Sequence, residues 1–287
     1  MENKLDLKKV LQNVVKLLLS IAAIYIILQN VDEKQALDYI KGVNYLFLFG
    51  AFVTFFISKA VSTLRINRFY KAKGFLLSDL VNFRLSLAGF FYNLFIPIIG
   101  GEGYKIFWLK KNKNIDLKTA SVAALLDRAS GLVALFVLIS LLFQVSTIQI
   151  EFKYAALLIL PAVYLIQYTV MKYAFPGFLS ANVTNSGLSL LVQIFQMITV
   201  YLVIRSLHIE ENQMDYVFVF MLATLAYVLP FIGAREMAFV FGAEYLGLDK
   251  DISFAIGILF YLAQTGTSLP GIFFMVFPNK IQGKELE

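Results

Sequence analysis

Six ionisable residues lie in stretches that are otherwise apolar enough to enter a lipid bilayer. They form three close pairs: Glu102 with Lys105, Asp127 with Arg128, and Arg235 with Glu236. A charged side chain at the centre of a membrane helix costs about 2.5–3.5 kcal/mol on insertion scales, so such residues usually face a protein interior and have a function. Carboxylates beside ammonium and guanidinium groups could bind a charged head group, and a guanidinium suits the oxygens of a phosphate.

The first pair belongs to the stretch "NLFIPIIGGEGYK" (93–105), where proline and glycine interrupt an apolar run. Free backbone amides at the start of the returning helix favour an anion. We therefore predict a head-group site at Glu102 and Lys105, with Asn93 and Tyr104 as further lining residues. The alternative is a local ion pair that only caps the break.

Asp127 lies about eight residues into a span that begins near Thr119, or roughly 12 Å along a helix. That depth is too great for a short carboxylate to reach water, so we predict contact with Lys105 or Arg235. Arg128 is expected to add positive charge to a phosphate-binding cavity. The alternative is a structural ion pair that holds two parts of the fold together.

Arg235 and Glu236 are neighbours on a predicted helix, where consecutive side chains diverge by about 100°. We expect them to point apart and to find separate partners in the other half of the chain. The alternative is an interfacial pair whose charged ends reach the outer membrane surface.

The elements around these residues are predicted to be membrane helices. The chain has 287 residues, 59% of them hydrophobic and 15% charged, with a mean hydropathy of +0.74. A soluble domain is usually about 45–50% apolar. Runs of roughly 20 apolar residues can cross a bilayer, and six are found, at 10–29, 43–62, 119–143, 154–175, 187–204 and 252–277. The first lacks a small-residue cleavage site, so it is interpreted as a retained span.

Two more apolar stretches, 81–110 and 216–247, are interrupted near their middles. Lysine and arginine collect in cytoplasmic loops, and basic clusters at the N-terminus, at 65–73, at 105–118 and at the C-terminus place all four on the cytoplasmic side. A stretch whose two ends both lie on the cytoplasmic side cannot cross the membrane once, so 81–110 is predicted to be a re-entrant hairpin. The stretch 216–247 follows an outward loop and precedes a span that must end inside, so it is predicted to be a hairpin that enters from the opposite face. The breaks are assigned to Pro97, Gly100, Gly101, Pro230 and Gly233.

Alignment of the breaks suggests an internal repeat. "IPIIGGEGYK" (96–105) matches "LPFIGAREM" (229–237), with Pro97 opposite Pro230 and Gly100 opposite Gly233. Repeat A covers 43–143, repeat B covers 187–277 in opposite orientation, and 10–29 and 154–175 are extra spans. The fold class is thus an all-α polytopic membrane protein, one domain over 1–287, with six transmembrane helices and two re-entrant hairpins. Inverted repeats with broken helices are typical of transporters, with the site at the repeat interface.

Several classes of function find no support. The chain has no cysteine and one histidine, His208, so thiolate and histidine-rich metal sites are excluded. There is no GxxxxGK[ST], HExxH or GxSxG with triad partners. We therefore expect no enzymatic activity, no cofactor and no metal. The net charge of +6 is explained by cytoplasmic loops rather than by nucleic acid.

Three motifs resemble the membrane region of lysylphosphatidylglycerol synthases and the flippase-like proteins that share it: "NLFIPIIGGEGYK", "ASVAALLDRASGL" (120–132) and "GAREMAFVFGAEYLGLDKDISFAIGIL" (233–259). The resemblance covers about 45–277. The family patterns are Pro-x-x-Gly-Gly ending in Arg, Glu-Arg followed by Gly, and Gly-x-Arg-Glu. Lys105 stands for the Arg and Asp127 for the Glu, while Arg128, Arg235 and Glu236 match as they stand. Lysine lacks the bidentate fork of arginine.

The resemblance implies re-entrant inverted repeats and movement of lipids between leaflets. Synthesis is not implied, because no aminoacyl-transferase region is found. We expect a translocase in the cell (inner) membrane, with both termini cytoplasmic, that moves an anionic phospholipid or a lipid-linked sugar. The alternative is an accessory or scaffold protein for a separate lipid-modifying or glycosyl-transferring enzyme. An intramembrane transferase lacks a catalytic constellation, and a homo-oligomer stays open.

Overall fold

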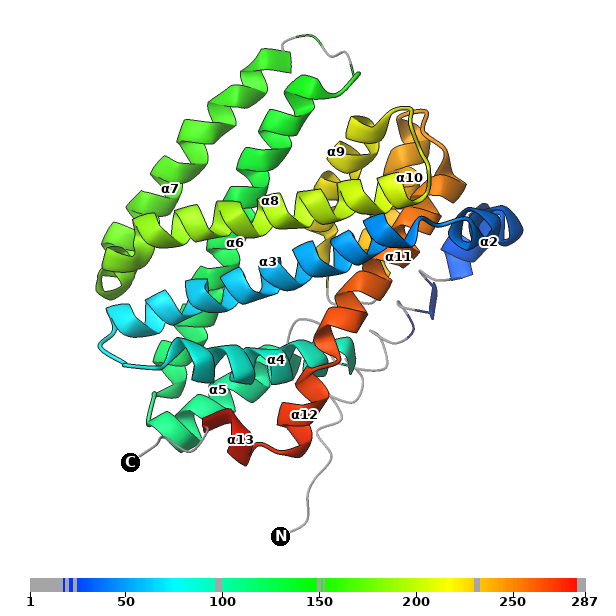
Figure 1. The fold of residues 1–287 in the computed structure, drawn as a ribbon. Helices are drawn as coiled ribbons and strands as arrows, with labels where there is room; N and C mark the ends of the chain where they lie inside the picture. Colours follow the sequence, from blue (N-terminus) through cyan, green and yellow to red (C-terminus); the bar gives the residue numbers. More distant parts are fainter. Residues whose placement is uncertain are drawn as a thin grey trace.

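The computed structural model describes residue 18 and residues 21–22, 25–95, 100–148, 151, 153–229 and 233–282. Every regular element in these residues is a helix (Figure 1). The helices are α2 (Glu33–Lys41), α3 (Tyr45–Ala72), α4 (Asp79–Phe95), α5 (Gly100–Lys113), α6 (Leu117–Val145), η1 (Lys153–Leu158), α7 (Ile159–Ala174), η2 (Pro176–Ala181), α8 (Asn182–Ser206), α9 (Gln213–Ala223), η3 (Thr224–Val228), α10 (Ala234–Tyr245), α11 (Lys250–Ser268), α12 (Gly271–Val276) and α13 (Asn279–Gln282). The all-α class is confirmed.

Four helical segments are long and apolar enough to cross a membrane: Tyr45–Ala72, Leu117–Val145, Lys153–Ala174 and Pro176–Ser206. They correspond to four of the six predicted spans. The predicted span 10–29 lies largely outside the described residues. The predicted span 252–277 is divided into α11 and α12 at Leu269 and Pro270, because proline lacks an amide hydrogen and its ring clashes with the preceding turn.

Helices α3 and α8 form an antiparallel pair at the centre of the molecule and lie side by side in Figure 1. The amide of Asn44, at the start of α3, donates to the carbonyl of Ser206, at the end of α8, over 2.8 Å. Near the middle of the pair, the hydroxyls of Thr54 and Thr199 are 2.9 Å apart. The two helices therefore run in opposite directions, as the predicted repeat requires of its first elements.

The basic cluster 65–73 was predicted to be a cytoplasmic loop, and this is wrong for most of its length. α3 continues to Ala72, because the first residue that favours a helix end is Gly74, whose φ is +83°. Arg65 consequently lies inside a helix and is buried, with 6% of its surface exposed. A count of charges alone assigns such a residue to the wrong environment.

The interrupted stretches fold as pairs of helices in contact. α4 packs along α5, and α9 with η3 packs on α10. Pro97 and Pro230 lie outside the described residues. Gly100 begins α5, while Gly233 precedes α10 with a φ of +91°, a conformation that glycine adopts without strain. The re-entrant course and the inverted repeat stay predictions.

Gly101 allows α4 and α5 to approach closely. A Cβ added at Gly101 would lie 2.1 Å from the carbonyl oxygen of Gly89 on α4. No side chain fits at that distance, so the crossing of the two helices depends on glycine at this point. The contact fixes the start of α5, and with it Glu102 and Lys105.

The buried apolar residues form two large clusters at opposite ends of α3. One surrounds Ala51 and Phe55 and joins α3 to α6, α8, α9, α10 and α11. The other surrounds Ile66, Phe69 and Tyr70 and joins α3 to α4, α5, α6 and η2. Between them, from Ser58 to Arg65, α3 presents polar side chains to its neighbours. The candidate site lies in this interval.

Candidate functional site

A cavity of about 630 Å³ lies between the two apolar clusters. Its walls come from α3, α4, α5, α6, α8 and η3. The polar and charged lining residues are Ser58, Lys59, Ser62, Thr63, Arg65, Ser86, Glu102, Lys105, Asp127, Arg128, Gln193, Gln196, Thr224 and Tyr227. Two of the three predicted pairs, Glu102 with Lys105 and Asp127 with Arg128, are thus brought to one cavity.

Helix α3 supplies the cavity with two adjacent rows of side chains. Ser58, Ser62 and Arg65 follow one row, and Lys59 and Thr63 follow the next. Residues spaced by three and four positions share one face of an α-helix. The rest of the wall comes from α4, α5, α6, α8 and η3, so the polar residues in the middle of α3 face other helices of the protein.

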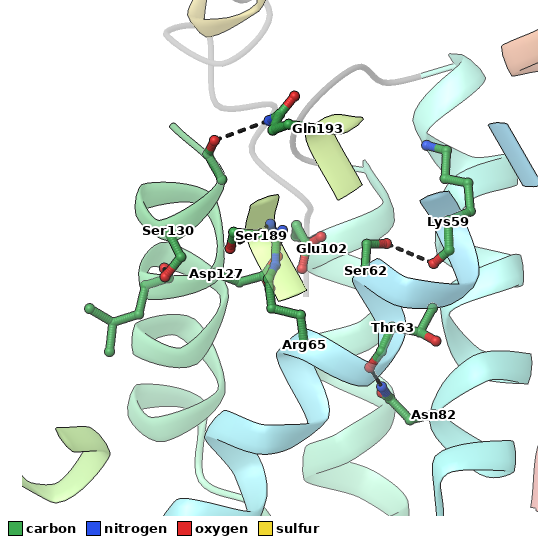
Figure 2. A network of polar contacts seen from close by, with 12 residues as sticks. Lys59, Ser62, Thr63, Arg65, Asn82, Glu102, Asp127, Ser130, Ser189 and Gln193 are labelled. Atoms are coloured by element: carbon green, nitrogen blue, oxygen red, sulfur yellow. Dashed lines mark hydrogen bonds and ion pairs between the residues drawn. The ribbon is translucent and has the colours of Figure 1, made fainter. Parts of the chain in front are cut away.

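Arg65 and Asp127 form a bidentate ion pair between α3 and α6. Nε of Arg65 donates to Oδ1 of Asp127 over 2.7 Å, and Nη2 donates to Oδ2 over 2.8 Å. The third nitrogen, Nη1, lies 3.2 Å from the hydroxyl of Ser189 on α8. Figure 2 shows Arg65 extending from α3 towards Asp127, with Ser189 beside the pair. Three helices therefore meet at a single guanidinium.

The predicted partner of Asp127, either Lys105 or Arg235, is therefore wrong. Both carboxylate oxygens are engaged by Arg65, a residue that the sequence interpretation had placed in a loop. Space for the guanidinium comes from Gly131 on α6, since a Cβ there would lie 3.1 Å from Nη1 of Arg65. The Gly131 carbonyl also accepts a hydrogen bond from Nε2 of Gln193 over 3.0 Å.

Glu102 and Lys105 pair with each other on α5. Nζ of Lys105 is 2.9 Å from Oε1 of Glu102, and the two side chains are 7% and 22% exposed respectively. Oε2 of Glu102 is buried without a hydrogen-bond partner. The pair is local, as the simpler alternative predicted, but both of its members also line the cavity, as the functional prediction required.

Lys59 is a cavity residue that the sequence interpretation missed. Its Nζ lies 4.3 Å from the centre of the Phe90 ring and 5.1 Å from that of Phe55. Among the described residues, no carboxylate lies within the 4.0 Å of an ion pair with Lys59. The sequence signal was available, because Lys59 stands alone about 21 Å along an apolar helix that begins at Tyr45.

The cavity has an excess of positive charge. Its lining holds four basic side chains, those of Lys59, Arg65, Lys105 and Arg128, and two acidic ones, those of Glu102 and Asp127. Electrostatic interactions are less screened in such an interior than at the surface. The arrangement therefore favours a ligand with one or two negative charges.

Arg235 and Glu236 pair with each other, which contradicts the expectation that they point apart. Nε of Arg235 donates to Oε1 of Glu236 over 3.1 Å, and Nη2 contacts the same oxygen. Both side chains are long, so the 100° between the two Cβ directions does not keep their charged ends apart. Gln264 of α11, also in the second half, lies 3.5 Å from Nη1.

Aromatic rings surround the guanidinium of Arg235. Its centre lies 5.2 Å from the Phe220 ring, 5.4 Å from the Tyr227 ring and 4.7 Å from the Phe260 ring. Tyr227 also lines the polar cavity, so Arg235 lies behind that wall. Glu236 borders a different, mostly apolar cavity of about 370 Å³ between α10 and α11.

Asn93 and Tyr104, which were predicted to line the cavity, are not among its lining residues. The side-chain oxygen of Asn93 accepts a hydrogen bond from the amide of Gly101 over 2.8 Å, which stabilises the first turn of α5. Tyr104 stacks on Tyr92, with the ring centres 4.6 Å apart, and faces a separate pocket of about 290 Å³. Neither residue meets the cations of α3.

The described residues contain no cluster of His, Asp and Glu suited to a metal ion.

A family model for the lysylphosphatidylglycerol synthase TM region matches residues 13–181. This is more than half of the chain. The chain belongs to the lysylphosphatidylglycerol synthase TM-region family. With its four apolar spans, it is a membrane protein of a family related to lipid handling. No curated protein and no solved structure matches it.

The TM-region family match includes α3, α4, α5 and α6, and thus Lys59, Arg65, Lys105, Asp127 and Arg128. It ends at residue 181, before α8, so the third motif of the resemblance, at 233–259, lies beyond it. The family assignment therefore concerns the half of the molecule that supplies most of the charged cavity wall. Arg235 and Glu236 are interpreted from their contacts alone.

Proposed function

We propose that the protein is a lipid translocase that moves an anionic phospholipid or a polyprenyl-phosphate-linked lipid between leaflets, without enzymatic activity. The observation that carries the proposal is the cavity of about 630 Å³, with four basic and two acidic side chains, inside a helical membrane protein. Charged groups are expensive in a membrane and mark substrate pathways. A phosphate is the part of these lipids that matches the excess positive charge.

The architecture supports alternating access to this cavity. α3 and α8 are antiparallel, and each is followed by a pair of helices in contact, α4 with α5 and α9 with α10. This order fits two inverted repeats whose interrupted helices are re-entrant hairpins, a plan of transporters with a central site. We further propose six spans, an inner-membrane location and cytoplasmic termini, as the distribution of basic residues indicates.

Lys59 and Lys105 are the proposed phosphate contacts. They come from α3 and α5, on two sides of the cavity, and each lies within electrostatic range of the other. Arg65 has its donors committed to Asp127 and Ser189, so it orders the wall instead. A hydrogen bond to a charged group contributes about 1.5–3 kcal/mol, which is more than tenfold in affinity.

Reconstitution tests the proposal directly. Vesicles of phosphatidylcholine with a fluorescent phosphatidylglycerol in both leaflets are treated with a membrane-impermeant quencher, which reaches inner-leaflet lipid only if the protein moves it. Wild type should accelerate the slow phase of quenching, which reports inner-leaflet lipid, and the double variant Lys59→Met/Lys105→Met should slow that phase by more than about tenfold. A fluorescent polyprenyl phosphate in place of phosphatidylglycerol separates the two substrate classes.

The matched control is Lys110→Met, which removes a charge from the same helix as Lys105 but at an exposed position outside the cavity lining. It should transport as wild type does. Equal rates for wild type and protein-free vesicles with both lipids would refute the translocase. The family's description as part of a synthase favours the accessory role as the second candidate, and co-purification of a lipid-modifying enzyme without transport would establish that role.

A further inference from the structure

The structure contains a second, apolar groove next to the polar cavity, and the function proposed above does not use it. We infer that this groove holds an acyl or prenyl chain of the same lipid whose head group occupies the cavity. The inference rests on the proposed function. It adds that a hydrocarbon chain of the lipid binds inside the protein, whereas translocation could also proceed with all chains in the bilayer.

The groove has a volume of about 550 Å³ and lies between α6, η1, α7, α9 and α10. Its described lining has no charged side chain. α10 provides Ala238, Gly242 and Tyr245, which share one face of the helix, and Leu246 follows at its C-cap. Ser140 on α6 donates its hydroxyl to the carbonyl of Phe136 in its own helix, so it offers the groove no donor. A ligand here gains from apolar contact and from little else.

Helix α6 joins the cavity to the groove. Its residues from Leu125 to Leu135 line the polar cavity, and its residues from Ile139 to Phe143 line the groove. Leu135 and Ile139 are four residues apart, or about one turn and 6 Å along the axis. The groove thus begins along α6 where the cavity ends, and a molecule with a polar head and an apolar chain matches that order.

The short helix η3 borders both spaces. A 3₁₀-helix has three residues per turn, so residues three apart lie on one face. Thr224 and Tyr227 line the polar cavity, whereas Ala226 and its counterpart one turn earlier, Ala223 at the end of α9, line the groove. η3 thus presents polar side chains to the cavity and a small apolar side chain to the groove.

The size of the groove-side residues favours a chain rather than a folded partner. The small side chains of Ala223, Ala226 and Ala238, together with Gly242, leave a space of about 550 Å³ beside larger groups such as Phe143 and Phe218. A flexible hydrocarbon chain fits such a space, while a protein helix is about 10 Å across. The occupant is therefore a hydrocarbon chain, and the covalent link to the head group explains why the two spaces adjoin.

A photoreactive lipid tests the inference on the full-length protein. The probe is phosphatidylglycerol with a diazirine near the end of one acyl chain, in phosphatidylcholine vesicles, with cross-linked peptides identified by mass spectrometry. We expect cross-links on α6 from Ile139 to Phe143 and on α10 and its C-cap from Ala238 to Leu246. The Lys59→Met/Lys105→Met variant should reduce them about tenfold, because a head group lost from the cavity releases its chain.

Two neighbouring alanines of η1 give a matched pair of variants. Ala156 lines the groove, whereas Ala155 is exposed and does not. Ala156→Phe should lower the groove cross-links at least about fivefold, since it excludes apolar contact, and Ala155→Phe should leave them unchanged. Ala238→Leu narrows the groove from the opposite wall, and it replaces Ala156→Phe if that variant does not elute as a single species in detergent.

The outcomes separate this inference from the proposed function. Groove cross-links that do not change in the Lys59→Met/Lys105→Met variant, or that fall equally in Ala155→Phe, would mean that the groove binds bulk lipid, and would overturn the inference even if transport is confirmed. Cross-links that depend on Lys59 and Lys105 without transport in vesicles would instead refute the translocase and support the groove.

Discussion

Arg65 and Arg235 are both more than nine-tenths buried, yet the two halves of the molecule hold them differently. In the first half, both oxygens of Asp127 bind Arg65, and a hydroxyl of α8 takes a further nitrogen. In the second half, one oxygen of Glu236 and three aromatic rings surround Arg235. The first arrangement joins three helices beside an open cavity, and the second packs a cation into an apolar core.

The difference locates the net charge of the site. In the first half, two carboxylates face four basic side chains around one cavity. In the second half, Arg235 pairs with Glu236, and the net charge of the pair is zero. The first half therefore offers an anion a net attraction, while the second half supplies a wall. Four predictions test this comparison, from the largest expected effect to the smallest.

Asp127→Ala should be the most damaging change, because it leaves the guanidinium of Arg65 buried without its carboxylate. Removal of one partner from a buried ion pair costs about 3–5 kcal/mol. The free energy of unfolding, measured by titration with a denaturing detergent, should fall by that amount. Asp38→Ala, which breaks the exposed pair with Lys41, should cost no more than about 0.5 kcal/mol. A loss below about 1 kcal/mol for Asp127→Ala would mean that Arg65 has another anchor.

Gly101→Ala should rank second, since its Cβ would lie 2.1 Å from the Gly89 carbonyl oxygen and force α5 away from α4. Overpacking of this kind costs about 1–3 kcal/mol. The counterpart in the aligned second half is Ala234, which already has a Cβ, so the close crossing is a property of the first half. A Cβ added at Gly103 would have no neighbouring atom within 4 Å, so Gly103→Ala should not destabilise the protein. Equal unfolding curves for Gly101→Ala and wild type would contradict the close crossing.

Arg235→Lys should have a smaller effect, about 1 kcal/mol. Lysine keeps the charge near Glu236 but loses the planar group that stacks on three rings. The same exchange at Arg65 removes a bidentate fork between helices, so Arg65→Lys should cost more than Arg235→Lys in the same detergent titration. The reverse order would show that the aromatic environment, rather than the carboxylate, is the stronger anchor.

The sequence predicted the all-α class and four of the spans, because apolar run length is a local signal. It also predicted that Glu102, Lys105, Asp127 and Arg128 share a cavity. It did not predict which charges pair, since pairing depends on how each helix is rotated about its axis. Asp127 met Arg65 because Gly131 leaves room for a guanidinium, and that contact spans 62 residues of sequence.

Two residues were missed for different reasons. Arg65 was assigned to a loop because basic residues near a span end are usually cytoplasmic, although no helix-ending residue precedes Gly74. Lys59 was missed because the span was identified by its average hydropathy, and one lysine among apolar residues changes that average only slightly. Its isolation was itself the signal, because a lysine far from both helix ends cannot reach the interface easily.

Lys59→Met should have the smallest effect on stability. Among the described residues, no carboxylate pairs with Lys59, and its contacts are the rings of Phe55 and Phe90, which methionine also packs against well. The free energy of unfolding should stay within about 0.5 kcal/mol of wild type, the range of changes that remove no defined interaction. Lys105→Met, by contrast, leaves Glu102 partly buried without its cation and should cost about 1–3 kcal/mol.

If Lys59→Met lowers the free energy of unfolding by more than about 1 kcal/mol, Lys59 is a structural cation like Arg65. The first half would then offer an anion no uncommitted cation on α3, and the contrast between the two halves would be wrong. With stability unchanged, a roughly tenfold slower transport of phosphatidylglycerol by the same variant would assign Lys59 to the ligand. Lys59 is costly to bury, makes no ion pair with a described carboxylate and faces a cavity. An anion that enters the cavity would offset the cost of burying this charge.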